Sequence, residues 1–293
     1  MSLQLHLGQN GPLSGKSWAT QLLKEVAALR VHFSLWRRKM QVSATILFTL
    51  VATVSRAEWK VISAQTESSS APGLEHRYVV SEDSTTGERV STEFTLFSAK
   101  SFSLRIVDQP AESRIDLAEA MRREKCLAGV NGGYFDPDYK PIGLLIADGK
   151  VIAPLQRARL LSGVLSASPS KIQISRVGEF SGRQKIDSAV ECGPMIVDLG
   201  RAVRGLEATR LARRTFAAVG AGDRAALGFC SEITLADLAN ILAPQVTSGF
   251  KIQRALNLDG GSSSAFWFRR KDGSAFSIPE QKAVRDFIAV VPR

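Results

Sequence analysis

The chain has 293 residues, 44% of them hydrophobic and 23% charged, with a formal net charge of +10. This is the composition of an ordinary globular protein, and the length allows one large domain or two small ones. Residues 1–57 hold seven Lys/Arg and one acid, which leaves 31 basic and 27 acidic residues, a net charge of +4, in 58–293. So small an excess, without a basic stripe interleaved with aromatic residues, argues against a nucleic-acid partner and suits an anionic substrate.

The first 57 residues have the pattern of an export signal. The basic residues Arg37, Arg38 and Lys39 precede an apolar run at 44–54, and the small residues around Ala57 provide a cleavage site. The run is short for a membrane span, which needs about 20 apolar residues. We therefore expect an N-terminal extension and signal over 1–57, a periplasmic or secreted protein, and membrane contact only through an uncleaved signal.

Small polar residues between 63 and 73 predict a flexible linker over 58–73, followed by one domain over 74–293. The three cysteines, Cys126, Cys192 and Cys230, allow at most one disulfide, and the sequence does not choose the pair. No Cys/His cluster has metal-ligand spacing, so we expect no metal and no other cofactor.

The domain reads as many short strands and two helices. A helix is predicted at 116–125 with Asp116 as N-cap, and another at 234–242 with Thr234 as N-cap. Strands are predicted at 75–80, 93–99, 103–108, 127–130, 143–147, 150–153, 171–177, 195–197, 214–219, 224–229, 255–258, 265–268 and 286–291. Hairpin signals such as Asp148-Gly149 dominate, and predicted strands do not alternate regularly with helices as in βαβ units. The predicted fold class is α+β: a single domain with a mixed, mostly antiparallel sheet and a few packed helices.

Two glycine turns about 130 residues apart carry the clearest chemical signal. They are Asn131-Gly132-Gly133-Tyr134-Phe135 and Leu258-Asp259-Gly260-Gly261-Ser262-Ser263-Ser264. Each follows an apolar run that predicts a strand, and its glycines let the backbone turn sharply and bring N–H groups to a ligand. We expect both turns to converge on one cleft for an anionic or sugar-like substrate.

Together with three further segments, these turns resemble the phosphodiester glycosidase family. In chain order the five are Asn131–Phe135, Gly193-Pro194-Met195-Ile196-Val197, Arg214-Thr215 leading a strand to Gly220, the helix at 234–242, and Leu258–Ser263. The resemblance covers roughly residues 125–293, more weakly from about 75. The best-known member, the lysosomal uncovering enzyme, removes N-acetylglucosamine from a sugar phosphodiester. The resemblance implies a secreted or lumenal hydrolase of glycosyl phosphodiesters, but it does not identify the sugar.

The chemistry of that substrate assigns two principal roles. Arg214 is the candidate phosphate binder, because a guanidinium fork matches two phosphate oxygens, and Thr215 adds a hydroxyl. The alternative is a solvated arginine in the basic run formed with Arg210 and Arg213. Asp259, at the end of a predicted strand, is the candidate catalytic carboxylate, as nucleophile or base. Its alternative is a turn aspartate that binds its own backbone.

The remaining candidates surround these two. Asn131, with Gly132 and Gly133, is expected to position the substrate, unless Asn131 only shapes the turn. N–H and hydroxyl donors are expected from three more positions: Gly260, Gly261 and Ser263. Glu191 is the candidate partner acid, and its alternative is a surface glutamate.

Two other kinds of site fit the sequence poorly. A calcium loop through Asn131, Asp136 and Asp138 would place Lys140 where another oxygen ligand is expected. Ser262–Ser264 lack the closing glycine of a nucleophile elbow, and His76 is the only histidine beyond the signal.

The leading hypothesis is an exported hydrolase that cleaves a small-molecule or glycan phosphodiester at the anomeric carbon and releases a sugar and a phosphomonoester. Two alternatives stay open. One is a non-catalytic protein that binds envelope glycans or anionic polymers in the same cleft. The other is a phosphodiesterase that breaks the P–O bond.

Overall fold

The computed structural model describes residues 58–293, apart from 111–113, 183–184 and 245–248. The described residues belong to one compact unit over Ala57–Arg293. The expected export signal over 1–57 lies outside the described residues.

The structure corrects the predicted fold class, because the protein is mostly β. Of the described residues 49% lie in strands and 9% are helical. Only two α-helices occur in this part of the chain, α2 (Leu117–Arg123) and α3 (Leu235–Leu242). All the strand pairings described are antiparallel, and the strands form curled antiparallel sheet structure. The prediction of α+β with a mixed, mostly antiparallel sheet and a few packed helices is wrong, because the described strands pair only in antiparallel ladders, which hairpins can connect without the crossovers that parallel pairing needs.

Eighteen strands form three sheets in the described residues. The largest has the order β1-β2-β3-β14-β13-β15-β11-β12. Its strands are β1 (Trp59–Ser68), β2 (Glu75–Asp83), β3 (Arg89–Ser98), β14 (Arg224–Ile233), β13 (Ala212–Gly220), β15 (Ile252–Asn257), β11 (Met195–Asp198) and β12 (Arg201–Ala202).

The two smaller sheets have five strands each. The order in one is β7 (Lys150–Ala153), β6 (Leu145–Ala147), β10 (Ser188–Cys192), β8 (Gly163–Ala167) and β9 (Ile172–Arg176). The order in the other is β17 (Ala275–Ile278), β16 (Phe266–Arg269), β5 (Ala128–Asn131), β18 (Asp286–Pro292) and β4 (Phe102–Asp108).

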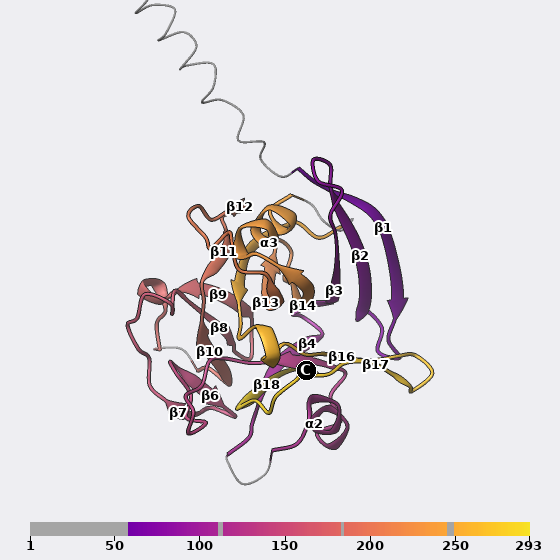
Figure 1. Cartoon of the computed structure of the whole chain (residues 1–293). Helices are drawn as coiled ribbons and strands as arrows, with labels where there is room; N and C mark the ends of the chain where they lie inside the picture. Colours follow the sequence, from indigo (N-terminus) through magenta and orange to yellow (C-terminus); the bar gives the residue numbers. More distant parts are fainter. Residues whose placement is uncertain (1–57, 111–113, 183–184, 245–248) are drawn as a thin grey trace, which may run out of the picture. The chain divides into compact units, whose positions relative to one another are not determined.

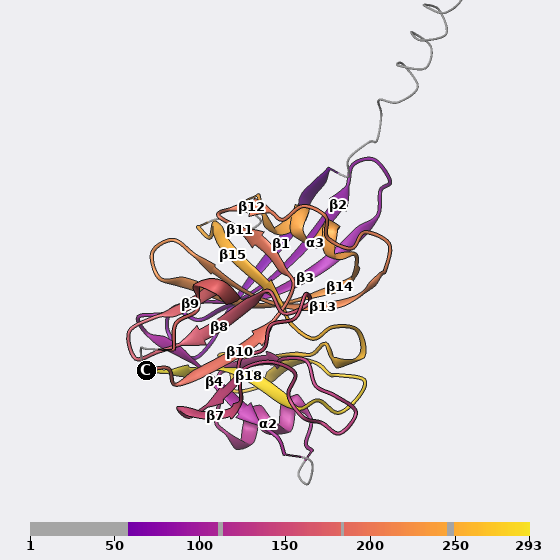
Figure 2. The same ribbon diagram turned by 90° about the vertical axis from the view of Figure 1, so that its left-hand side faces the viewer.

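The inner faces of all three sheets share one hydrophobic core, and side-chain alternation assigns each residue to a face. On β13, Ala217 faces this shared core while its neighbour Phe216 faces the core beneath α3. On β18, Ile288 faces the shared core while Phe287 packs against α2. Helix α3 thus covers the outer face of the eight-stranded sheet, and α2 covers the outer face of the sheet containing β5 (Figures 1 and 2).

Several local predictions are confirmed. Asp116 Oδ1 accepts a hydrogen bond from Glu119 N (2.7 Å), and Thr234 Oγ1 accepts one from Asp237 N (3.1 Å), so both helices begin at the predicted N-caps. Asp148 and Gly149 have φ of 48° and 75°, as the predicted hairpin turn between β6 and β7 requires.

The predicted linker over 58–73 is wrong for most of its length, because it contains strand β1. This strand is exposed along most of its residues and is held by its antiparallel ladder with β2. The three cysteines are free and buried. Burial raises the pKa of the Cys126 thiol to about 11 and that of Cys230 to about 12, so these thiols stay protonated at neutral pH.

Candidate active site

The two glycine turns meet, because each follows a strand that ends at the same junction between sheets. Asn131 is the last residue of β5, and Asn257 is the last residue of β15. Asn131 Nδ2 donates to the carbonyl oxygen of Asp259 over 2.7 Å, and Asp259 N donates to the carbonyl oxygen of Gly132 over 3.1 Å. The predicted convergence of the turns is therefore present in the structure.

The first turn requires glycine for a steric reason. A Cβ at Gly132 would collide with Oδ1 of the buried Asp286 carboxyl. In the second turn, Gly261 begins a single 3₁₀ turn, Gly261–Ser263, with φ of +64°, a backbone conformation that side chains disfavour.

A pocket of about 300 Å³ opens beside the second turn. It is lined by Tyr134, Leu160, Pro194, Glu207, Arg210, Ala212, Arg214, Leu235, Asn257, Asp259, Gly260 and Gly261. Four residues predicted from the sequence are therefore in its wall: Arg214, Asp259, Gly260 and Gly261.

The two arginines of the pocket differ in the number of hydrogen bonds that their guanidinium groups make to the described residues. Arg214, on β13, is only 8% exposed. Its Nε donates to the Ile233 carbonyl (3.0 Å) and its Nη2 to the Arg210 carbonyl (2.8 Å). Its Nη1 makes no hydrogen bond to the described residues. Arg210 lies in the loop before β13, and its guanidinium has no hydrogen bond or ion pair with the described residues. Arg210 is thus the freer cation of the pocket.

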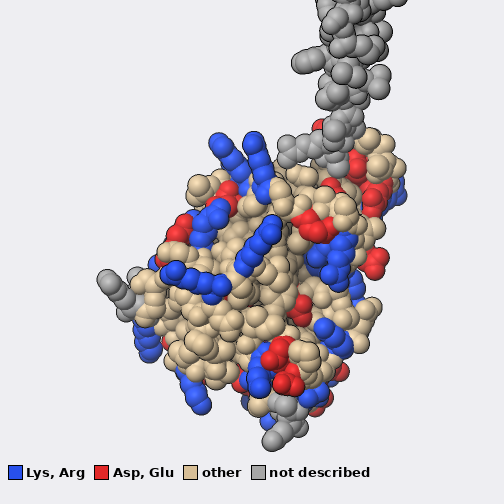
Figure 3. Space-filling view, turned by 60° about the vertical axis from the view of Figure 1, so that its left-hand side comes forward, with Lys and Arg blue, Asp and Glu red and all other residues tan. Residues whose placement is uncertain are grey.

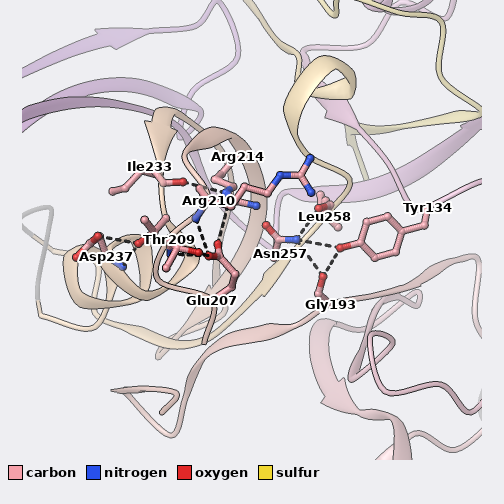
Figure 4. A network of polar contacts seen from close by, with 11 residues as sticks. Tyr134, Gly193, Glu207, Thr209, Arg210, Arg214, Ile233, Asp237, Asn257 and Leu258 are labelled. Carbon is pink, nitrogen blue, oxygen red and sulfur yellow. Dashed lines mark hydrogen bonds and ion pairs between the residues drawn. The ribbon is translucent and has the colours of Figure 1, made fainter. Parts of the chain in front are cut away.

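Glu207 organises the loop that carries Arg210. Its carboxylate accepts hydrogen bonds from the backbone N–H of Thr209 and of Arg210 and from the Thr209 hydroxyl, and it lies 3.6 Å from Arg214 Nη2. The Thr209 hydroxyl and these N–H groups lower the pKa of Glu207, so it is an ionised anchor and not a proton donor. Figure 4 shows this network on one side of Asn257, with Tyr134 on the other.

Asp259 is half-buried, and burial raises the pKa of its carboxyl above the usual range. The neighbouring Ser263 hydroxyl, the Lys282 ammonium and the Gly260 N–H act in the opposite direction. Asp259 Oδ1 accepts a hydrogen bond from Gly260 N (2.9 Å). This is the contact expected of a turn aspartate that binds its own backbone, the alternative role given to Asp259 from the sequence. Asp259 also lines the pocket, and the turn contact fixes one oxygen of its carboxyl there.

Tyr134 forms the opposite wall. Its hydroxyl donates to the Gly193 carbonyl and accepts a hydrogen bond from Asn257 Nδ2 (3.2 Å). Burial raises the pKa of the phenol, so Tyr134 stays neutral. Phe135 does not line the pocket: its ring is stacked on Tyr139 at 5.2 Å, and Lys282 Nζ lies 5.1 Å from the centre of the ring.

Other predicted residues lie directly behind the pocket. Asn131 is fully buried, and its Oδ1 accepts hydrogen bonds from Thr215 Oγ1 (2.7 Å) and Ala265 N (3.0 Å). Thr215 and Ser263 are also fully buried. The N–H of Gly133 points to Asp286 (3.2 Å) and not to the pocket. Asn131, Gly132, Gly133, Thr215 and Ser263 thus support the wall of the pocket and do not line it.

Glu191, the candidate partner acid, lies elsewhere. It is fully buried in β10, and its Oε2 accepts hydrogen bonds from Leu144 N (2.8 Å) and Gln156 N (2.9 Å). It is not among the residues that line the pocket. A Cβ at Gly143 would approach Glu191 within about 3 Å, so the carboxylate is enclosed by that loop.

Sequence reasoning did not assign functions to Arg210, Glu207 and Asn257. The basic run 210–214 was visible, but the sequence did not show which arginine faces the pocket. Arg213 and Arg214 are adjacent on β13 and point to opposite faces. Arg213 donates to the carbonyl oxygens of Ser264 and Pro279, away from the arginines of the pocket.

A larger pocket, of about 580 Å³, lies beside β1 and β2. Its polar side chains pair with one another: His76 Nε2 lies 2.6 Å from Glu93, and Arg270 Nε lies 2.9 Å from Glu67. It contains none of the predicted site residues, so the smaller pocket is the candidate site.

The described residues carry few features of a metal, membrane or nucleic-acid partner. They contain no cluster of three or more His, Cys, Asp and Glu side chains that could hold a metal. None of their helices has the length and apolar character to cross a bilayer. On the face shown in Figure 3, most Lys and Arg side chains stand apart, with uncharged surface between them.

Comparison with known proteins matches the region that contains this pocket to a family model. Residues 124–291, more than half of the chain, match the model of the family described as phosphodiester glycosidase. The chain is also 30% identical over 91 residues to the uncharacterized protein YigE of Escherichia coli K12. That match covers 29% of this chain and only 36% of the length of YigE.

Two solved structures share the fold. The catalytic domain of zebrafish N-acetylglucosamine-1-phosphodiester alpha-N-acetylglucosaminidase, auto-inhibited by its pro-peptide, is similar with a TM-score of 0.59 and 19% identity, over 79% of this chain and 88% of that one. A hypothetical protein from Synechocystis is similar with a TM-score of 0.55 and 16% identity, over 80% of this chain and 68% of that one. At these identities the likeness concerns the fold alone.

Proposed function

This chain belongs to the phosphodiester glycosidase family, and we propose that it is a hydrolase that cleaves a glycosyl phosphodiester at the anomeric carbon. The products are a sugar and a phosphomonoester. The observation that carries the proposal is that Asp259 and Arg210 line the same pocket of the family-matched region, and that the Arg210 guanidinium has no partner among the described residues.

The basic side of the pocket suits the phosphate. A phosphodiester carries one negative charge, and Arg210 and Arg214 present two guanidinium groups beside the turn that contains Gly260 and Gly261. Hydrogen bonds from a guanidinium to phosphate oxygens are charge-assisted and can be bidentate. Arg214 is fixed by backbone carbonyls, so in this proposal it supplies a preorganised charge while Arg210 makes the mobile contact.

Asp259 carries the chemistry at the sugar. The C1–O bond breaks and its electron pair leaves on the phosphate oxygen, while Asp259 acts at C1 as nucleophile or as base toward water. In either case the oxygen that finally bonds to C1 comes from water. A departing phosphate needs less protonation than an alkoxide, so Glu191, enclosed outside the pocket, has no part in this step.

Residues behind the pocket position Asp259. Asn131 holds the Asp259 backbone through its carboxamide, and Thr215 fixes that carboxamide in turn. The proposal also includes export to the periplasm or the outside, on the basis of the signal pattern in 1–57, and no nucleic-acid partner.

The test is turnover. The full chain is incubated with an α-N-acetylglucosaminyl phosphodiester, and released sugar is measured for the wild type and for Asp259→Asn. We expect turnover by the wild type and a loss of at least about 100-fold in kcat for the variant, which keeps the side-chain volume but lacks the carboxylate. Tight binding of the phosphodiester without turnover by the wild type would instead support a non-catalytic binding protein.

A further inference from the structure

Behind the first glycine turn lies a carboxyl group that the mechanism above does not use. Asp286, the first residue of β18, is 1% exposed. Its Oδ1 accepts a hydrogen bond from Gly133 N (3.2 Å), and its carbonyl oxygen accepts one from Gly132 N (2.9 Å). Its Oδ2 is buried and has no hydrogen-bond partner among the described residues. Both glycines of the turn are therefore built around this side chain.

No cation pairs with Asp286 in the described residues. The charged and titratable groups around it are Asp108, Arg285, Asp259 and Cys192. Asp108 on β4 is its partner in the strand register, and the neighbouring Arg285 pairs with Asp108 (2.7 Å) and not with Asp286. Asp259 lies across the turn, and Cys192 on β10 is a buried thiol.

This surrounding disfavours an ionised carboxylate. A buried charge without a partner is costly, and a lone oxygen with no donor adds to that cost. Burial, together with the charges of Asp108 and Asp259, raises the pKa of Asp286 to about 7, against the opposing hydrogen bond from Gly133.

We propose that Asp286 is a positioning residue that works as a neutral acid. In this form it anchors the Asn131–Gly133 turn without placing a second negative charge behind Asp259. If Asp286 lost its proton, its negative charge would repel the Asp259 carboxylate. This repulsion would weaken the turn to which Asp259 is hydrogen-bonded. The catalytic part of this inference rests on the proposed function; the protonation itself does not.

The first test measures thermal stability against pH for the full chain and for Asp286→Asn, which is neutral at every pH and keeps an oxygen for Gly133 N. The pKa of Asp286 is about 7 in the folded state, against an ordinary value near 3.8 in the unfolded chain. Between these values only the folded chain holds the proton, so the stability of the wild type falls as pH rises, and the variant lacks this loss.

We expect the Tm of Asp286→Asn, relative to the wild type, to increase steadily from about pH 4 to about pH 7 and to stay level above. Asp138→Asn, at an exposed carboxylate, is the matched control and should show no such trend. A variant Tm that falls further below the wild type as pH rises would show that an ionised Asp286 is needed, and would overturn the proposal.

Carbon-13 NMR of the aspartate carboxyl groups tests the same point without altering Asp286. We expect one signal with a midpoint near pH 7 that persists in Asp259→Asn. If every aspartate signal shows full ionisation by about pH 5, the proposal is wrong.

The activity of the same proteins tests the positioning role. Asp286→Asn should keep the kcat of the wild type at about pH 6 and lose less of it at about pH 9, because its side chain cannot ionise. A variant that loses activity equally at both pH values would contradict the role. If the wild type shows no turnover at any pH, the proposed function fails, while the thermal and NMR profiles still decide whether Asp286 holds the proton.

Discussion

Asn131 is the residue that joins the two glycine turns, and its whole carboxamide is used for this. Its Nδ2 holds the Asp259 carbonyl, and its Oδ1 holds Thr215 Oγ1 and Ala265 N. The sequence predicted this residue at the site. It did not predict that the side chain binds protein groups, because those partners lie between 84 and 134 residues away along the chain.

Replacement of Asn131 by Ala should therefore reduce both stability and turnover. The change removes a hydrogen-bond partner from three buried polar groups, at about 1–3 kcal/mol for each group left unpaired, so we expect a loss of at least about 3 kcal/mol in the free energy of unfolding. Urea unfolding measures this loss. Thr215→Ser keeps the hydroxyl, so its free energy of unfolding should fall by less than about 1.5 kcal/mol. An equal loss in both variants would show that the hydrogen bonds of the Asn131 carboxamide do not stabilise the site.

The Arg210 guanidinium makes no hydrogen bond or ion pair within the part of the chain that the structure describes, and replacement of Arg210 by Gln tests its contact with phosphate. A hydrogen bond to a charged group contributes about 1.5–3 kcal/mol, so kcat/KM should fall roughly 10- to 100-fold. Arg204→Gln, at an exposed arginine outside the pocket, removes the same charge and should change kcat/KM less than about threefold. Equal losses in the two variants would show that only net charge matters.

At the scale of elements, the beginning of α3 connects the fold to the pocket. Leu235, its first residue, lines the pocket, and the carbonyl oxygen of Ile233 just before it accepts a hydrogen bond from Arg214. Thr234 caps the helix by accepting from Asp237 N, and it also donates to the Asp237 carboxylate (2.7 Å). The orientation of Arg214 therefore depends on a local capping motif that the sequence showed.

Thr234→Ala should destabilise the protein by about 1 kcal/mol, the usual cost of a lost N-cap, and lower turnover through the displaced Arg214. Thr234→Ser keeps the hydroxyl and should retain most of both properties. The measurement is urea unfolding together with kcat/KM, and an alanine variant as stable as the serine variant would contradict the role of the cap.

Three of the strands that the sequence missed lack an alternation of apolar and polar residues. Strand β1 is exposed on both faces, so it has no alternation of apolar and polar residues and resembles a linker. Strands β8 and β10 are buried at every residue, so they also lack alternation. Hairpin turns and helix caps depend on neighbouring residues, and these were predicted correctly.

At the scale of the whole molecule, the site forms where strand ends of different sheets meet. Strand β5 belongs to a five-stranded sheet and β15 to the eight-stranded sheet. The motifs predicted that both turns belong to one cleft, and the structure places them within hydrogen-bond distance. The sequence did not show which side chains line that cleft, because this depends on how β10 packs and on where the loop before β13 lies. Glu191 was therefore assigned to the cleft, and Arg210 was not.

If the glycosidic C1–O bond breaks, the oxygen atom from water ends on the sugar, and an isotope experiment measures this. The full chain is incubated with an α-N-acetylglucosaminyl phosphodiester in water labelled with heavy oxygen, and the phosphomonoester is examined by mass spectrometry. We expect an unlabelled phosphomonoester, with the label in the released sugar. Label in the phosphomonoester would show cleavage of the P–O bond, and the protein would then not be a glycosidase.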